Sequence, residues 1–113
     1  MTDKKYEPWM PITDVRTLRI LGKAAEEAAE LCKALNRAII QGLDGIDPHT
    51  GKSNITAILE EVVDTQVTVD RVTDMLELTD EQLDWMVGRW ERKTKNLKEW
   101  QDGDLDFEEG DDE

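Results

Sequence analysis

The sequence is poor in several features, and each shortage excludes a class of protein. Cys32 is the single cysteine among 113 residues, so no intrachain disulfide is possible, and its place on an apolar stripe indicates a packed thiol. No apolar run approaches the ~20 residues that span a membrane. The first residues, MTDKKYEPWMP, lack the hydrophobic core of a signal peptide. We therefore expect a soluble, cytoplasmic protein with no membrane partner.

Basic residues are also scarce. The chain has 14 Lys and Arg against 27 Asp and Glu, a formal net charge of −13, whereas proteins that bind nucleic acids hold phosphates with clustered basic residues. We therefore expect no nucleic-acid partner. The last twelve residues, DGDLDFEEGDDE, hold eight of the acids and no base. This composition predicts a disordered acidic tail over 102–113, which serves either solubility or the docking of a partner.

Strand patterns are missing, and the apolar residues instead recur at helical spacing. The first such stretch covers 14–41, where Thr13 or Asp14 can cap the start and Gly42 can end the helix. Its periodic positions form one stripe along the helix: Leu18, Leu21, Ala25, Ala28, Cys32, Leu35 and Ile39.

Two further helices follow. One is predicted from Ser53 or Asn54 to about residue 77, with many β-branched residues but with a length of some 23 residues, far too long for a strand. The other begins at Thr79 and Gln82, which have the spacing of a capping box, and runs to about residue 100.

These helices predict an all-α fold, a helical bundle of three main helices in one domain over 13–101. A flexible N-terminal arm is expected over 1–12 and the acidic tail over 102–113. Because a chain of this length buries a small share of its surface, we expect oligomerisation to complete the bundle, as a homodimer or a homotetramer.

The stretch GIDPHTGKSNI, residues 45–55, contains the letters GKS of a phosphate-binding loop. That motif needs four residues between its first glycine and the Gly-Lys pair, with a strand before and a helix after. Here five residues separate Gly45 from Gly51, and a helix precedes them. The stretch is therefore predicted to be a turn between two helices, with its end capping the second.

Two pairs of carboxylates occupy helical positions where like charges repel. Glu27 and Glu30 are i, i+3 neighbours in the first helix, and Glu61 and Asp64 are so related in the second. Since acids are abundant here, chance explains either pair alone. Both pairs, however, fall at the margin of an apolar stripe, and they converge if the two helices pack antiparallel.

Four convergent carboxylates are costly without cations, because burying unpaired charge is expensive. Mg²⁺ and Mn²⁺ take oxygen ligands and relieve that cost, so the pairs predict a site for Mg²⁺ or Mn²⁺. His49 is the single histidine and lies in the loop, which argues against a zinc or histidine-dependent di-iron site. It is expected to be a plain surface residue.

The EAAEL of the first helix and the EEVVD of the second resemble the E-x-x-E … E-x-x-D signature of the all-α nucleoside triphosphate pyrophosphatases, the MazG-like enzymes and their dimeric dUTPase relatives. The resemblance covers about residues 18–97 and is closest to short members, including phage-encoded ones, for which the compartment would be the host cytoplasm. It implies that four residues bind Mg²⁺ engaged with a triphosphate: Glu27, Glu30, Glu61 and Asp64. Thirty residues separate Glu30 from Glu61, more than is usual, so the loop is an insertion that could affect base preference.

The implied reaction converts a nucleoside triphosphate and water to a monophosphate and pyrophosphate, in control of the nucleotide pool. Glu61 is our choice as the base or water-orienting group, because it lies closer to the apolar margin than Asp64 and desolvation would raise its pKa. A purine deoxynucleotide is favoured, because two or three tryptophans could enclose a large ring.

Substrate contacts beyond the metals need donors and stacking groups. The candidates come from all three helices and the loop, and an ordinary solvated surface is the alternative for most of them: Lys23, Lys52, Asn54, Trp85, Arg89 and Lys93. Two other functions stay open. One is a non-enzymatic acidic helical module that inhibits or recruits a partner, and the other is a nucleotide-binding regulator with a degenerate site.

Overall fold

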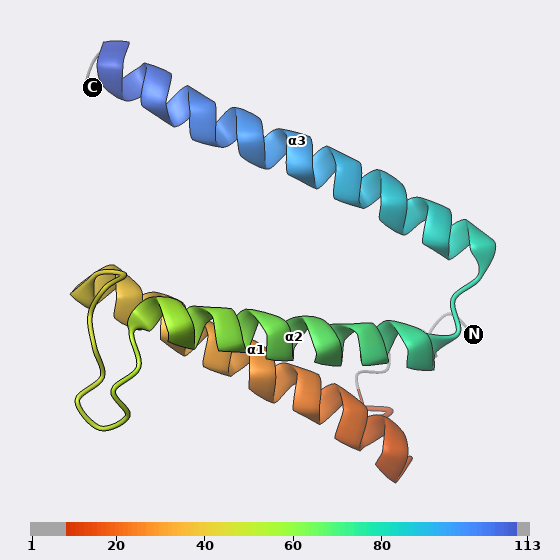
Figure 1. Ribbon diagram of the computed structural model, residues 1–113. Coiled ribbons are helices and arrows are strands. Elements are labelled where there is room, and N and C mark those ends of the chain that lie inside the picture. Colours follow the sequence, from red (N-terminus) through yellow and green to blue (C-terminus); the bar gives the residue numbers. More distant parts are fainter. Residues whose placement is uncertain (1–8, 111–113) are drawn as a thin grey trace. The chain divides into compact units, whose positions relative to one another are not determined.

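The described part of the chain folds into three helices, which confirms the predicted all-α class. The computed structural model describes residues 9–110, with side chains through Gly103. Its helices are α1 (Val15–Gln41), α2 (Asn54–Leu76) and α3 (Asp80–Gly110) (Figure 1). Within the described residues there is no strand, only an isolated bridge between Ile46 and Ser53. None of the described helices has the length and apolar character that crossing a membrane requires.

The ends of α1 follow from local chemistry. Asp14 is the N-cap, and its carboxylate accepts a 2.8 Å hydrogen bond from the Thr17 N–H, one of the donors that a helix start leaves unpaired. The Thr17 hydroxyl donates to the same carboxylate at 2.8 Å, and this bond, followed by the one from the N–H, lowers the pKa of Asp14 below its ordinary value. At the other end Gly42 takes a φ of 89° and donates its N–H to the Ala38 carbonyl at 2.7 Å. The predicted cap and stop are both confirmed.

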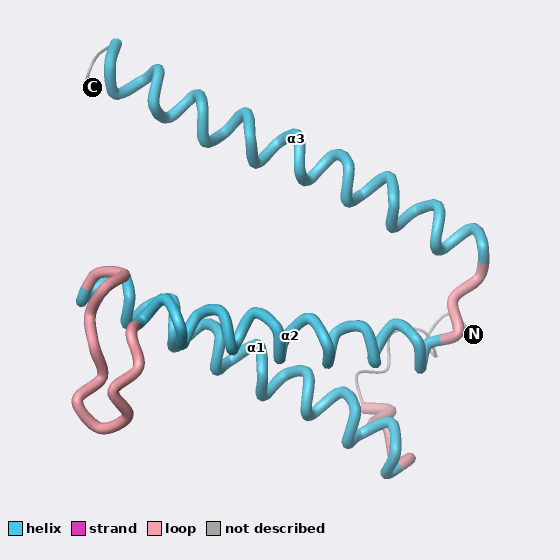
Figure 2. Tube along the Cα trace, viewed as in Figure 1, coloured by secondary structure: helices cyan, strands magenta, loops and turns pink. Residues whose placement is uncertain are grey.

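The segment from residue 42 to residue 53 is a loop between two helices, drawn in pink in Figure 2, rather than a phosphate-binding motif. The Asn54 N–H donates to the Gly45 carbonyl at 2.8 Å, and its side-chain amide donates to the Gly42 carbonyl at 2.8 Å. A Cβ at Gly45 would lie 2.8 Å from that amide nitrogen, so the loop requires a glycine there. Ser53 accepts the Thr56 N–H at 3.1 Å and so caps α2, as predicted.

The loop returns the chain so that α1 and α2 pack antiparallel. Asn54 at the start of α2 bonds with Gly42 just after α1, while Thr65 farther along α2 bonds with Glu27 farther back in α1. Figure 1 shows α1 and α2 leaving the loop together and diverging toward the start of α1. The antiparallel arrangement on which convergence of the carboxylates depended is therefore present.

The face of α1 that packs on α2 is not the predicted apolar stripe. Ala38 is buried, whereas Ile39 beside it is 79% exposed and Leu35 is 43% exposed. The less exposed positions of α1 follow a second line, which includes Glu27: Ile20, Leu21, Ala24, Glu27, Leu31, Ala34 and Ala38. The periodicity correctly predicts a helix, but most of its stripe faces away from α2.

Helical geometry places the exposed apolar residues of α1 and α2 on one side of the pair. Ile39 follows buried Ala38 in α1, and Leu59 follows half-buried Ile58 in α2. On each helix the exposed residue therefore lies about 100° around the axis from the residue that faces the other helix, in the same sense. Because the helices are antiparallel, equal rotations reach the same side. We call this surface the apolar face: Leu18, Leu35, Ile39, Ile55, Leu59, Val69 and Leu76.

The opposite side of the pair is charged. Glu30 precedes half-buried Leu31, and Asp64 precedes half-buried Thr65, a rotation of about 100° in the reverse sense. The pair of helices therefore has an apolar face on one side and carboxylates on the other.

Helix α3 forms a second unit, residues 77–113, and is described by itself. The predicted capping box is confirmed, since Gln82 accepts the Thr79 N–H at 2.9 Å and Thr79 accepts the Gln82 N–H at 3.1 Å. A lone helix cannot bury its own stripe, and its apolar side chains are exposed: Leu83, Val87, Trp90 and Leu97.

The two predicted terminal segments fall partly outside the described residues. Of the N-terminal arm over 1–12, residues 1–8 are outside; of the tail over 102–113, residues 111–113 are outside. The third helix is predicted to end near residue 100, whereas the structure continues α3 to Gly110; disorder of the tail stays a prediction. The stretch has no proline to interrupt the ladder of main-chain hydrogen bonds, which is why helix can extend past the predicted end.

Candidate metal centre

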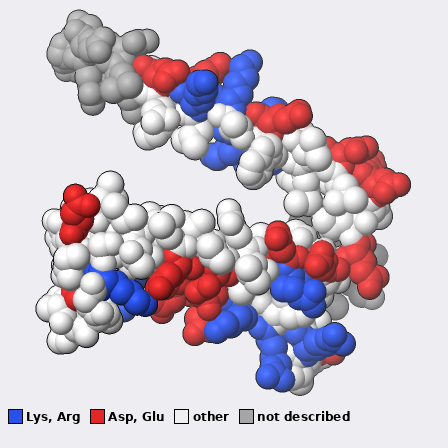
Figure 3. All heavy atoms as spheres, in the orientation of Figure 1, with Lys and Arg blue, Asp and Glu red and all other residues white. Residues whose placement is uncertain are grey.

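Three of the four predicted carboxylates meet between α1 and α2. Glu27 comes from α1, and Glu61 and Asp64 come from successive turns of α2; each offers an oxygen, and these oxygens lie within 4.8 Å of one another. Figure 3 shows acidic side chains gathered along the middle of this unit. Glu27 and Glu61 are half-buried and Asp64 is exposed, so the group opens to solvent at one side. We call these three residues the carboxylate cluster.

Glu30 lies outside the carboxylate cluster. It is exposed, one turn along α1 from Glu27, and it lines the adjoining pocket together with Glu61. Its charge still acts on the cluster, since it contributes to the raised pKa of Glu61. The sequence predicted four convergent carboxylates, and the structure brings three together with the fourth beside them.

A hydrogen bond between the helices joins them at the turns that carry the cluster. The hydroxyl of Thr65 donates to the main-chain carbonyl of Glu27 at 3.1 Å. Thr65 follows Asp64 directly and is one turn from Glu61. Thr65 therefore aligns the carboxylate-bearing turns of both helices.

The surroundings of Glu61 disfavour the charged form of its carboxylate. One of its oxygens, Oε1, is buried and has no hydrogen-bond partner among the described residues. Burial raises the pKa of Glu61, and the neighbouring charges of Asp64, Glu27 and Glu30 raise it further. A buried carboxylate oxygen without a donor is uncommon, because leaving it unsatisfied costs free energy. The unpaired oxygen and the raised pKa both show that the charged form of Glu61 is disfavoured at this position.

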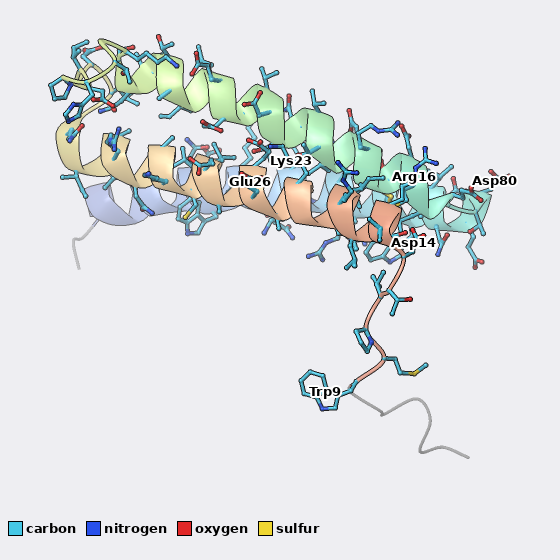
Figure 4. All side chains as sticks on the ribbon, turned by 90° about the horizontal axis from the view of Figure 1, so that it is seen from below. Trp9, Asp14, Arg16, Lys23, Glu26 and Asp80 are labelled. Atoms are coloured by element: carbon cyan, nitrogen blue, oxygen red, sulfur yellow. The ribbon has the colours of Figure 1, made fainter. Side chains whose placement is uncertain are left out.

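Lys23 supplies one cation at the edge of the cluster. Its ammonium lies 3.2 Å from the Glu27 carboxylate and 3.4 Å from that of Glu26, and Figure 4 labels Lys23 and Glu26 on the middle of α1. The hydrogen bond with Glu27 is the main cause of the raised pKa of Lys23. Lys23 therefore stands next to the cluster, as predicted, but as the partner of Glu27 and not of Glu61.

A pocket of about 340 Å³ adjoins the cluster on the loop side. Glu61 and Glu30 line it, as do the predicted substrate residues Lys52 and Asn54. Lys52 is paired with Glu60 at 2.9 Å. Asn54 is only 2% exposed and its amide nitrogen donates to the end of α1, so it holds the two helix ends together at the pocket wall.

Two basic residues of this pocket were missed at the sequence level, Lys33 and Arg37. They follow Glu30 by three and seven positions, which is the spacing of one helical face. That signal was present in the sequence.

The remaining candidates belong to the second unit. Trp85, Arg89 and Lys93 lie on α3, and Trp85 is 63% exposed. Their spacing along the helix is one residue per turn, as the sequence indicated. A contact of these residues with substrate stays a prediction.

The loop histidine and the cysteine take no part in the cluster. His49 donates its main-chain N–H to Asp47 at 2.8 Å, and Cys32 is exposed on α1. Exposure of Cys32 contradicts the expectation of a packed thiol, because most of its stripe faces away from α2.

Comparison with protein-family models, with curated proteins and with solved structures gave no match. The resemblance to the all-α nucleoside triphosphate pyrophosphatases accordingly rests on the sequence signature, and it stays a prediction.

Proposed function

We propose that this protein is a metal-dependent nucleoside triphosphate pyrophosphohydrolase, which converts a nucleoside triphosphate and water to a nucleoside monophosphate and pyrophosphate. The observation that supports it best is the buried Oε1 of Glu61, which has no donor among the described residues and belongs to a cluster of three carboxylates. Carboxylates at this distance repel unless a cation lies between them.

The donor set fits Mg²⁺ or Mn²⁺. The cluster offers only carboxylate oxygens, the ligands that these hard cations prefer. Glu27, Glu61 and Asp64 would hold the ion, and Glu30 is the further acid within reach of the same pocket. Lys23 is the cation that forms an ion pair with the cluster among the described residues, so a divalent cation improves the charge balance of the three carboxylates.

Hydrolysis of a phosphoanhydride needs positioning, charge compensation and an activated water. When bound, Mg²⁺ or Mn²⁺ offsets phosphate charge and makes a water more acidic. Glu61 is the candidate for orienting that water or accepting its proton, because burial and the neighbouring acids raise its pKa and so favour uptake of a proton. The water oxygen joins one phosphorus of the α–β bridge, and the bridging bond breaks to release pyrophosphate.

Substrate contacts are assigned by their place around the cluster. Lys23 borders Glu27, and Lys52 and Asn54 line the adjoining pocket; Trp85, Arg89 and Lys93 on α3 are proposed from the sequence. A purine deoxynucleotide is the proposed substrate, with the loop at residues 42–53 placed to contact it at the pocket rim.

A second copy of the chain is proposed to cover the apolar face. Its large apolar side chains are open to solvent in the single chain. The exposed fraction is between 43% and 79% for each of five of them: Leu18, Leu35, Ile39, Leu59 and Leu76. Apolar side chains aligned over the length of two helices are typical of a bundle interface. Because this face lies opposite the carboxylates, a homodimer or a homotetramer built through it would leave the charged side open.

The decisive experiment is a screen of common and modified nucleoside triphosphates with detection of pyrophosphate and of orthophosphate. We expect pyrophosphate release that requires Mg²⁺ or Mn²⁺ and is lost in Glu61→Gln. Release of orthophosphate alone, or no product from any nucleotide, would rule the proposal out.

A further inference from the structure

The pocket beside the carboxylate cluster has a wall of three basic side chains. Lys33 and Arg37 come from consecutive turns of α1, and Lys52 comes from the loop. The ion pair of Arg37 with Asp47 of the loop brings the loop beside this part of α1. Figure 3 shows basic side chains next to the acidic ones at the loop end of this unit.

Two of these cations are held in place by ion pairs. The Arg37 guanidinium lies 3.2 Å from Asp47, and the Lys52 ammonium lies 2.9 Å from Glu60. Asp47 also accepts the His49 N–H at 2.8 Å, which anchors its carboxylate to the loop when Arg37 turns to another anion. Lys33 is exposed and forms no ion pair with any residue in the described part of the chain.

The charge of the pocket depends on whether a divalent cation is bound. Its lining has three cations, Lys33, Arg37 and Lys52, and four acids, Glu30, Asp47, Glu60 and Glu61, a sum of −1. A divalent cation at Glu61 would change that sum to +1. An anion would then be attracted to the pocket, beside the cation and against the basic wall.

Size restricts which anion fits. The pocket volume of about 340 Å³ is at the small end of the range of about 300–1,000 Å³ for ligand pockets. Small Ala34 and Ala57 on its walls leave the space open. A chain of two phosphates suits this volume better than a whole nucleotide.

We propose that Lys33, Arg37 and Lys52 form the binding site for the two terminal phosphates of the substrate, the part that leaves as pyrophosphate. The proposal rests on the proposed function for the identity of the ligand, since a nucleoside triphosphate cleaved at the α–β bridge presents these phosphates. Lysine and arginine bind phosphate oxygens through charge-assisted hydrogen bonds. The nucleoside then extends out of the pocket, past the carboxylate cluster.

The test is calorimetric titration of the full chain with inorganic pyrophosphate in the presence of Mg²⁺. For Lys33→Gln and for Arg37→Gln we expect the Kd to rise about tenfold, the effect of losing one charged contact. Arg16→Gln is the matched control, because Arg16 is on the same helix but about 31 Å from Arg37 along its axis. Kd values within twofold of wild type for both pocket variants would overturn the proposal.

A third variant is expected to bind pyrophosphate more tightly, a result that misfolding could not produce. Glu60→Gln frees Lys52 from its ion pair, so we expect pyrophosphate to bind a few-fold more tightly, whereas structural damage would weaken binding. Weaker binding in Glu60→Gln, with helical circular dichroism unchanged, would also contradict the site.

Failure of this site and failure of the enzyme are distinguishable. If no nucleotide is hydrolysed but Lys33→Gln and Arg37→Gln still weaken pyrophosphate binding, the basic wall is a pyrophosphate site and the proposed activity is wrong. If nucleotide is hydrolysed and both variants keep the wild-type KM and the wild-type inhibition by pyrophosphate, the enzyme stands and the proposed site is overturned.

Discussion

The hydroxyl of Thr65 on α2 donates a 3.1 Å hydrogen bond to the main-chain carbonyl of Glu27 on α1. The bond joins the two turns that bear the carboxylate cluster, and it lies in the half-buried contact between the helices. A hydroxyl in such a contact needs an acceptor, because an unpaired polar group there is costly. The bond therefore fixes the register of α1 against α2 at the turns that carry the cluster.

Replacing Thr65 by Val tests this relationship. The side chain keeps its shape and loses its donor, so we expect the free energy of unfolding to fall by about 1 kcal/mol, measured by urea denaturation monitored by circular dichroism. Thr68→Val is the matched control, because the Thr68 hydroxyl bonds only within α2, to the carbonyls of Asp64 and Thr65. An equal loss of unfolding free energy in both variants would show that the bond between the helices stabilises the protein no more than a bond within α2 does.

Glu61→Gln should stabilise the protein in the absence of divalent cations. Burial and the nearby acids raise the pKa of Glu61 in the folded state, so the folded chain holds that proton more tightly than the unfolded chain does. Stability from this group is therefore complete at low pH and is lost as the pH rises from the ordinary carboxyl range through the raised pKa. Gln has no such proton to lose.

Denaturation at a series of pH values, with a chelator present, measures the effect. We expect the stability difference between Glu61→Gln and wild type to grow as the pH rises and to level off above the raised pKa. A difference that does not depend on pH would mean that Glu61 is not electrostatically strained.

Divalent cations should stabilise the folded protein by mass action. With Mn²⁺ at a hundred times its Kd, the expected gain in the free energy of unfolding is about 2.7 kcal/mol, visible as a rise in Tm. Asp64→Asn and Glu61→Gln should each lose most of that gain, whereas Asp70→Asn, on the same helix but outside the cluster, should keep it. No rise in the wild-type protein would favour the alternative function, a non-enzymatic acidic helical module.

The apolar face should mediate self-association. Ile39 belongs to this face and Ile40 does not, although the two are equally exposed at 79% and 82%. We expect Ile39→Glu to shift the protein to monomer, because a charge there would be buried in the interface. Ile40→Glu should leave the oligomer intact. Light scattering after size-exclusion chromatography gives the mass, and a wild-type monomer at high concentration would rule the interface out.

Much of the local structure was predictable from short-range chemistry. Apolar spacing indicated all three helices, and single residues marked their ends, as Asp14 and Gly42 do for α1. The Thr79 and Gln82 pair at the start of α3 behaves in the same way. These features depend on neighbours within four residues, so the sequence alone contains the information. The end of α3 was missed because composition favours disorder where the main-chain ladder can still continue.

The candidate site was only partly predictable, because a carboxylate on one helix has no partner until the other helix is placed. The i, i+3 pairs identified Glu27, Glu61 and Asp64, but the structure separates Glu30 from them. It also joins Lys33 and Arg37 to Lys52 across the loop. Contacts of this kind link distant parts of the chain, and no local pattern encodes them.

The sequence by itself determined the helices, their caps, the turn that reverses the chain and the carboxylates available to it, since each depends on adjacent residues. The tertiary structure decided which face of α1 meets α2. Helical periodicity shows which apolar residues share a stripe, but not what that stripe packs against. Here the burial of Ala38 and the hydrogen bonds of Asn54 and Thr65 across the pair set the rotation. That rotation gathers the acids on one side and leaves the apolar face on the other.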